Sequence, residues 1–329
     1  MIPLIYTCER SIEVYGETQK YLEVSELEGE LELVLETLQI VGSTVPHTYE
    51  SFWSGHVFPW VEAYDDLQIS CNLCFFGLYK QAMTCLRSCL ELGLLSVYFN
   101  AQDRGHEVVR DWIRSREDTP MLRDVWPMLN RIRNVVKLQA SYDLQSRLLA
   151  LGYLHNYVHT KGYAFSNRFG LAVKPNYQVF SSEALGKWSR AAREVVTVLC
   201  ILHLLKYPQA TIRFDFFAKF GLNTPWAGFL EEFQIDRLRE IIEPDLFSIV
   251  NSIAESDPNV AEMRSYLASL PDLSEGEIEQ QYIDFDKMQI EGMGYERWLA
   301  IQQQIGWVDN SFQKRVGILR QWAEENGHT

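Results

Sequence analysis

A largely apolar stretch from residue 66 to residue 100 constrains the fold more than any other part of this 329-residue sequence. Between residues 67 and 98 only Lys80, Arg87 and Glu91 carry a charge. A helix that is apolar on most of its faces must be surrounded by other elements. We therefore predict one long helix over residues 66–100, at the centre of the molecule.

Helical spacing of apolar residues recurs along the rest of the chain, and strand signals are scarce. Amphipathic patterns predict further helices at residues 19–41, 104–116, 182–206, 235–252, 295–305 and 312–325. We therefore expect an all-α fold. Composition divides it into an acidic N-terminal helix with an aromatic segment (1–64), a helical bundle (65–208) and an acidic helical C-terminal region (209–329).

The charge of the chain is unevenly distributed. Residues 1–99 carry 4 basic and 14 acidic side chains, residues 100–206 carry 16 and 9, and residues 207–329 carry 10 and 21, which sum to the net charge of −14. The acidic total argues against indiscriminate binding of polyanions. The basic central segment permits contact with RNA or DNA on one face, although its arginines could instead pair with the acidic flanks.

Neither a signal peptide nor a membrane span is indicated by the sequence. The first residues contain an apolar run of only about five residues without a basic leader. No segment approaches the roughly 18 uninterrupted apolar residues of a spanning helix. We expect a soluble cytoplasmic protein that does not contact a membrane.

Four of the six cysteines are spaced C-x2-C-x10-C-x3-C, which superficially resembles a zinc site. Each gap lies inside a helical apolar pattern, whereas zinc-binding pairs usually lie on turns. We therefore predict that Cys74, Cys85 and Cys89 are small core residues. The acidic pair Asp284 and Asp286 is expected to face water, so no metal and no cofactor is predicted.

Two histidines lie on an apolar helical stripe in residues 148–163, LLALGYLHNYVHTKGY. A helix over residues 144–160 places His155 and His159 on one face, and Gly152 allows a neighbouring helix to approach closely. Imidazoles at a helix–helix contact need polar partners. We therefore expect a polar cluster around this pair.

Arg87 and Glu91 form a second polar pair, inside the apolar stretch. Their spacing of four residues puts them close enough to pair on one helix face. Burying a charged pair is rarely a net gain in stability. The pair therefore indicates either a polar functional site or a polar contact that makes the packing of the helices specific.

Common catalytic motifs are missing from the sequence. It contains no GxGxxG, Walker A, GxSxG or HExxH motif. His155 and His159 have the spacing of two zinc ligands on one helical turn, but Asn156 stands where a metalloprotease has glutamate. A third ligand would have to come from elsewhere.

A set of short motifs, taken in chain order, resembles a known family. The residues concerned are Arg87, Glu91, Trp112, Tyr153, Leu154, Tyr157, Val158, His159, Trp188, Tyr207 and Pro208. In these residues the segment 65–208 is similar to the HEPN-like helical bundles of prokaryotes, in particular the subgroup resembling abortive-infection proteins. The resemblance implies a HEPN-like bundle with an additional N-terminal helix and an acidic C-terminal region.

Members of that superfamily are often metal-independent RNases or toxins, and they dimerise so that an Arg-x4–6-His motif from each chain meets in a cleft. The resemblance thus implies a homodimer, RNA as the substrate, a partner protein from a defence or toxin–antitoxin system, and His159 as the catalytic histidine. No arginine stands five to seven residues before His159 (Gly152, Tyr153, Leu154) or before His155 (Leu148, Leu149, Ala150). We expect Arg87 to replace it, with the 2′-hydroxyl attacking in line, a histidine as acid or base and the arginine stabilising the phosphorane.

Three functions are compatible with these residues. The first is an antiviral-defence or toxin-type RNase with catalytic His159, His155, Arg87 and Glu91, and substrate-binding Tyr153, Asn156 and Lys161. The second is a non-enzymatic helical module that binds a partner protein or senses a ligand, with a buried network of Arg87, Glu91, Tyr153 and His159. The third, which we rank last, is a metal enzyme that uses both histidines and a carboxylate.

Overall fold

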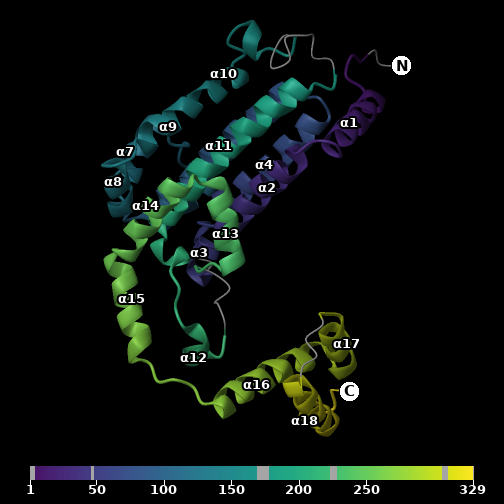
Figure 1. Cartoon of the computed structure of the whole chain (residues 1–329), viewed down its shortest axis with the longest axis vertical. Helices are drawn as coiled ribbons and strands as arrows, with labels where there is room; N and C mark the ends of the chain where they lie inside the picture. The colour runs from purple at the N-terminus through teal and green to yellow at the C-terminus, as the bar shows by residue number, and fades with distance from the viewer. Residues whose placement is uncertain (1–3, 46–47, 169–177, 223–227, 306–309, 329) are drawn as a thin grey trace. The chain divides into compact units, whose positions relative to one another are not determined.

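The structure, a computed structural model, describes residues 4–45, 48–168, 178–222, 228–305 and 310–328, apart from the side chains of residues 122, 305, 310 and 311. In this part of the chain every regular element is a helix (Figure 1), which confirms the predicted all-α class. The chain forms two compact units, residues 1–213 with 226–263 and residues 214–225 with 264–329. Each unit has a hydrophobic core of its own.

Two helices joined by a tight turn form the centre of the first unit. α4 (Phe58–Phe75) and α5 (Tyr79–Asn100) replace the single long helix predicted over residues 66–100. The break comes at Gly77, which has a φ of +72°. A β-carbon there would lie 3.0 Å from the side chain of Val14 and 3.1 Å from the backbone of Val179. Glycine is therefore required at this turn, which lets α5 pack back along α4.

α11 (Ser182–Lys206) completes the central layer and lies at the residues predicted for it. The indole of Trp188 in α11 donates a hydrogen bond to Oγ of Ser70 at 2.8 Å, and Ser70 donates to the carbonyl of Ala82 at 2.6 Å. These bonds connect α11, α4 and α5. α5 is long and apolar enough to cross a bilayer by length and composition alone, but 61% of that window is buried inside the molecule, as expected for a core helix.

The N-terminal region belongs to the first unit. The helix predicted over residues 19–41 is interrupted, because α1 (Cys8–Leu22) ends and α2 (Leu27–Gly42) begins within that range. α3 (Tyr49–Ser54) follows. α2 packs on α11, and α13 (Glu232–Ile241) and α14 (Pro244–Glu255) cover the same core. The unit crosses the boundaries predicted at residues 64 and 208, because apolar faces from both sides are buried against the central helices.

Four short helices follow α5: α6 (Gly105–Ile113), α7 (Leu122–Leu129), α8 (Arg133–Gln139) and α9 (Leu144–Ala150). α7 begins at Leu122, and Thr119 before it accepts a hydrogen bond from the indole of Trp112 at 3.0 Å. Asp143 caps α9, because its carboxylate accepts from the backbone N–H of Ser146 at 3.0 Å.

The helix predicted over residues 144–160 is divided into α9, η1 (Leu151–Leu154) and α10 (His155–Val158). Leu151 and Leu154 remain buried through the 3₁₀ turn. Gly152 does not serve close helix packing as predicted, because a β-carbon there would meet no atom within 4 Å. Two further 3₁₀ turns are η2 (Tyr163–Phe165) and η3 (Pro208–Thr211). The sequence favours a loop over residues 160–178, and residues 169–177 of it lie outside the described residues.

The second unit is built from α12 (Phe216–Phe220), α16 (Glu275–Met293), α17 (Tyr295–Ile305) and α18 (Asn310–Asn326), and the boundary between the units falls within α15 (Pro258–Ser269). Trp298 is fully buried at its centre and donates from its indole to Asp286 at 3.3 Å. Asp286 is therefore buried and pairs with Arg315 at 3.4 Å, whereas it was predicted to face water. Asp284 does face water.

Candidate functional site

A groove of about 570 Å³ lies between α5 and the segment formed by α9, η1 and α10. Its walls are mostly leucines of these elements, and residues 119–121 border it. Four side chains that are charged or titratable also line it: Arg87, Glu91, Arg123 and His155. A concave, largely apolar site with a few convergent polar groups has the usual composition of a ligand site.

Arg87 and Glu91 form the predicted ion pair within this groove. Nη2 of Arg87 lies 2.5 Å from Oε1 of Glu91, and the two side chains are 25% and 40% exposed. Burial raises the pKa of Glu91, and the neighbouring guanidinium opposes that rise. The pair uses one of the five N–H donors of the guanidinium, so the others can bind an oxyanion in the groove.

His155 faces the same groove from α10. Desolvation, followed by the positive charges of Arg87, His159 and Lys161, lowers its pKa. The lowered pKa favours the neutral ring, which is able to accept a proton. The imidazoles of His155 and His159 lie side by side, with ring centroids 4.3 Å apart. The groove thus brings together a guanidinium and a carboxylate from α5 and an imidazole from α10.

The remaining predicted site residues lie around the groove but do not line it. His159 and Lys161 are exposed, and Asn156 is half-buried. Tyr153 lies in a separate cavity of about 350 Å³, together with Arg190. The predicted placement of the two histidines at a helix–helix contact is wrong, because both side chains are exposed to solvent.

The buried network predicted for the non-enzymatic module does not form. Arg87 and Glu91 are paired in an open groove, His159 is exposed, and Tyr153 borders a different cavity. The reason is the tightening of the backbone at η1, which turns consecutive side chains toward different neighbours.

The segment that follows α10 is held against α5 by polar contacts. Nζ of Lys80 lies 2.5 Å from the hydroxyl of Thr160, and Gln81 donates to Asn167 at 3.0 Å. Thr160 has a φ of +48°, which ends α10 directly after His159. These contacts fix the segment directly after His159, which is the C-cap residue of α10.

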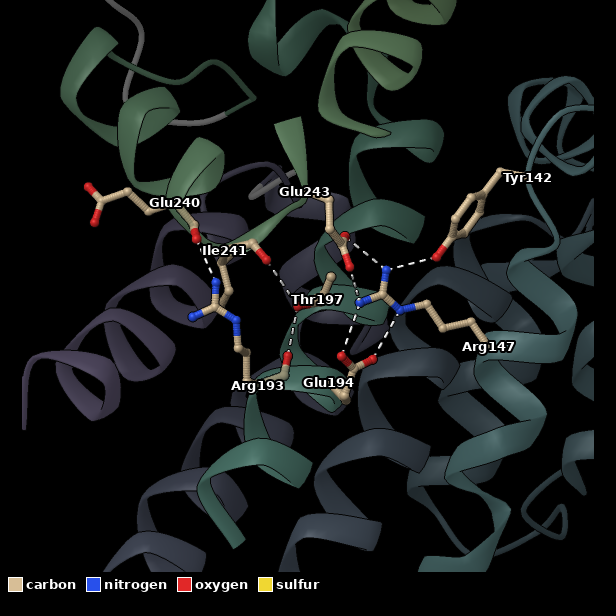
Figure 2. Close-up of polar contacts among 8 residues, drawn as sticks. All are labelled: Tyr142, Arg147, Arg193, Glu194, Thr197, Glu240, Ile241 and Glu243. Atoms are coloured by element: carbon tan, nitrogen blue, oxygen red, sulfur yellow. Dashed lines mark hydrogen bonds and ion pairs between the residues drawn. The ribbon is translucent and has the colours of Figure 1, made fainter. Parts of the chain in front are cut away.

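Arg147 of α9 forms a separate cluster of charge, shown in Figure 2. Its Nε and Nη2 donate to Glu194 at 3.0 and 3.2 Å, and its Nη1 donates to Glu243 at 3.0 Å and to the hydroxyl of Tyr142 at 2.8 Å. Burial alone lowers the pKa of Arg147, but the hydrogen bonds that its guanidinium donates to Glu243, Glu194 and Tyr142 raise the pKa overall. Because Nη2 also pairs with Glu243 at 2.9 Å, every donor of this guanidinium is engaged. Arg147 therefore joins helices and has no donor left for a ligand.

Arg193 joins the basic segment to both acidic flanks. Its Nη1 donates to Glu30 at 2.8 Å. Its Nη2 donates to the carbonyl of Glu240 at 2.6 Å, as Figure 2 shows. The prediction that arginines of the central segment pair with the flanks is thus confirmed for Arg147 and Arg193. Other arginines of that segment have no ion-pair partner in the described part of the chain, namely Arg110, Arg114, Arg131 and Arg133.

The cysteines behave as core residues. Cys74 and Cys89 are fully buried, Cys85 is half-buried, and all six thiols are free. Burial raises the pKa of Cys71 to about 12 and that of Cys85 to a lesser extent. Within the described ranges, no group of three or more His, Cys, Asp or Glu side chains gathers as a metal site requires.

Arg123 and Thr119 are groove residues that the sequence did not reveal. In the sequence, Asp-Thr-Pro at residues 118–120 indicated a break between helices. It did not indicate that this segment lies over α5. Their location depends on tertiary packing, because α7 lies against α5.

No family model, no curated protein and no solved structure matches the chain. The chemistry of the groove is therefore argued from its own residues.

Proposed function

We propose that this chain is a HEPN-like, metal-independent endoribonuclease of the antiviral-defence or toxin type, which acts as a homodimer in the cytoplasm. The observation that supports the proposal is the convergence of Arg87, Glu91 and His155 in one open groove. A cationic donor set beside a neutral imidazole is what in-line cleavage of an RNA phosphodiester requires.

His155 acts as the base in this proposal. Its neutral imidazole takes the proton of a ribose 2′-hydroxyl, the 2′-oxygen bonds to phosphorus and the bond to the 5′-oxygen breaks. The products carry a 2′,3′-cyclic phosphate and a 5′-hydroxyl. The uncommitted donors of Arg87 bind the non-bridging oxygens, on which negative charge grows in the transition state.

The acid that protonates the 5′-oxygen comes from the second copy of the chain. In-line attack places the attacking and leaving oxygens on opposite sides of phosphorus, and two rings with centroids 4.3 Å apart cannot flank a phosphate in that way. His159 therefore serves its own chain by lowering the pKa of His155. Light scattering at the assay concentration tests for the dimer that this arrangement needs.

The proposal is tested by incubating the full chain with end-labelled tRNA in the presence of EDTA. We expect cleavage that leaves 2′,3′-cyclic phosphate ends, a loss of about 10²-fold or more in His155→Ala, and a loss of about 10²–10³-fold in Arg87→Ala. An RNA with 2′-deoxyribose at the cleaved positions should resist.

Matched controls are His106→Ala and Arg104→Ala. His106 is an exposed histidine outside the groove, and Arg104 forms an ion pair with Glu107 just as Arg87 does with Glu91. Both variants should cleave like the wild type. Absence of cleavage, or full cleavage by Arg87→Ala and His155→Ala, would refute the proposal, and cleavage abolished by EDTA would favour the metal enzyme.

A second function, binding of a partner protein, is favoured by an exposed aromatic patch on α3 and α4. Tyr49, Phe52 and Trp53 are 83%, 66% and 67% exposed, which is unusual for neighbouring aromatic residues. Phe52 and Trp53 border a groove of about 430 Å³ that Arg110 and Arg114 also line. Neither arginine pairs with a carboxylate in the described part, so the patch fits an acidic amphipathic helix.

This second function is tested with a labelled acidic amphipathic peptide and its scrambled version as probes. We expect saturable binding of the amphipathic form alone, weakened by salt and lost in Phe52→Ser with Trp53→Ser. Phe233→Ser, which changes a phenylalanine that is 62% exposed elsewhere, is the matched control. Equal binding of both peptides would rule out this function for the patch.

A further inference from the structure

A polar cavity of about 440 Å³ lies where α8, the end of α11 and the start of α15 meet. It shares no lining residue with the groove around Arg87. The polar side chains that line it are Arg131, Arg133, Asn134, Lys206, Asp257 and Asn259. All of them belong to the first compact unit.

Asn134 carries an unpaired acceptor in this cavity. The side chain is only 3% exposed, and its Nδ2 donates to the carbonyl of Leu205 at 3.1 Å and to Oδ2 of Asp257 at 2.8 Å. Because both partners only accept, the orientation of the amide is fixed. Its Oδ1 is buried and has no donor among the described residues. Buried acceptors normally have a partner, and a donor on a molecule bound in the cavity can supply it.

Asp257 does not neutralise the cavity's positive charges by ion pairing. Its Oδ2 accepts from Asn134, and its Oδ1 accepts from the backbone N–H of Asn259 at 2.8 Å. The carboxylate is 4% exposed. It therefore holds Asn134 and the first turn of α15 in place.

Three cationic side chains line the same cavity as Asn134. Arg131, Arg133 and Lys206 have no carboxylate within ion-pair distance in the part of the chain that the structure describes. Burial lowers the pKa of Lys206, which an anion in the cavity would reverse. Two guanidinium groups next to an ammonium group form a binding set for phosphate.

We propose that this cavity binds a small phosphate monoester that also carries a hydroxyl or N–H donor, such as a sugar phosphate or a nucleotide. The phosphate pairs with Arg131, Arg133 and Lys206, and the donor of the ligand satisfies Oδ1 of Asn134. The volume of the cavity falls in the range of small-molecule sites and is far larger than an inorganic phosphate needs. The site is independent of the proposed RNase groove.

The proposal is tested by calorimetric titration of the full chain with ribose 5-phosphate, adenosine monophosphate, methyl phosphate and inorganic phosphate. We expect one saturable site per chain for ribose 5-phosphate or the nucleotide, and affinity at least about tenfold lower for methyl phosphate, which has no sugar hydroxyl or base N–H to meet Asn134. If the nucleotide binds more tightly than the sugar phosphate, part of the cavity binds the base. If the two bind equally, the sugar phosphate alone makes all the contacts that the cavity recognises.

Variants separate the cavity from general surface charge. Arg131→Gln with Arg133→Gln should weaken binding at least about tenfold and leave the fold intact, because both side chains are exposed. Arg237→Gln with Arg239→Gln makes the same change at the same spacing on α13 and should have no effect. Undetectable binding of both organic phosphates, equal affinity for methyl phosphate, or equal loss in the two double variants would overturn the proposal.

Discussion

At the scale of single residues, His203 is a buried base inside the core of the first unit. It is fully buried, its Nδ1 lies 2.7 Å from the carbonyl of Leu199, and its Nε2 lies 2.8 Å from Oγ of Ser96. A carbonyl only accepts, so Nδ1 carries the proton. The hydroxyl of Ser96 lies 2.8 Å both from Nε2 and from the carbonyl of Gly93, and its one proton can serve either acceptor. Burial lowers the pKa of His203 to about 4. The ring is thus neutral in the folded protein at every pH above that value.

This histidine should make stability fall in mild acid. An unfolded histidine has a pKa of about 6.5. Between pH 6.5 and 4 the unfolded chain therefore binds a proton that the folded chain does not, and stability is full above pH 6.5 and decreases below it. The unfolding free energy of the wild type should fall between pH 7.5 and pH 5. His203→Leu should make this fall smaller by about 2 kcal/mol, measured by urea denaturation.

The pH profile distinguishes titration from simple loss of packing. A substitution that only changes packing lowers the unfolding free energy by the same amount at both pH values. Parallel profiles for the wild type and His203→Leu would show that His203 does not titrate between them. His56, whose pKa is also lowered to about 4 by burial and by His106, should account for part of the slope that remains.

At the scale of elements, the turn between α4 and α5 depends on one glycine. Gly77 has a φ of +72°, and a β-carbon there would press on Val14 and on the backbone of Val179. We expect Gly77→Ala to lower the unfolding free energy by about 2 kcal/mol or more. Gly152→Ala is the matched control, because nothing lies within 4 Å of its added carbon, and it should raise stability by about 0.5–1 kcal/mol. Similar effects of the two substitutions in urea denaturation would contradict this account.

The sequence predicted those elements whose apolar stripe is bounded by polar residues. α11 and α17 lie at the residues predicted for them, 182–206 and 295–305. The helix predicted over residues 66–100 is divided because Gly77 lies between Phe76 and Leu78, so the apolar run continues through the turn and periodicity does not reveal it.

Local spacing also accounts for the part of the site that was predictable. The pairing of Arg87 with Glu91 followed from their separation of four residues, which places two side chains on one helix face. Arg123 reaches the same groove, and Asn134 contacts Asp257, only through packing between segments that are distant in the sequence. No local pattern encodes such a contact.

At the scale of the whole molecule, the chain has two separate cores, each centred on a buried tryptophan whose indole is hydrogen-bonded. Trp188 donates to Ser70 in the first core, and Trp298 donates to Asp286 in the second. Both side chains are almost completely buried. Because no residue belongs to both clusters, loss of one core should leave the packing of the other unchanged.

We therefore expect the two units to unfold independently. Trp298→Ala removes a large side chain and should cost the second unit about 3–5 kcal/mol, and Trp188→Ala should do the same to the first. Hydrogen exchange locates each effect: the first variant should lose protection in α16–α18 and keep it in α5 and α11, and the second should show the reverse. If either variant loses protection in both units, the two cores fold as one cooperative body. The Arg87 groove could then not be studied apart from the second unit.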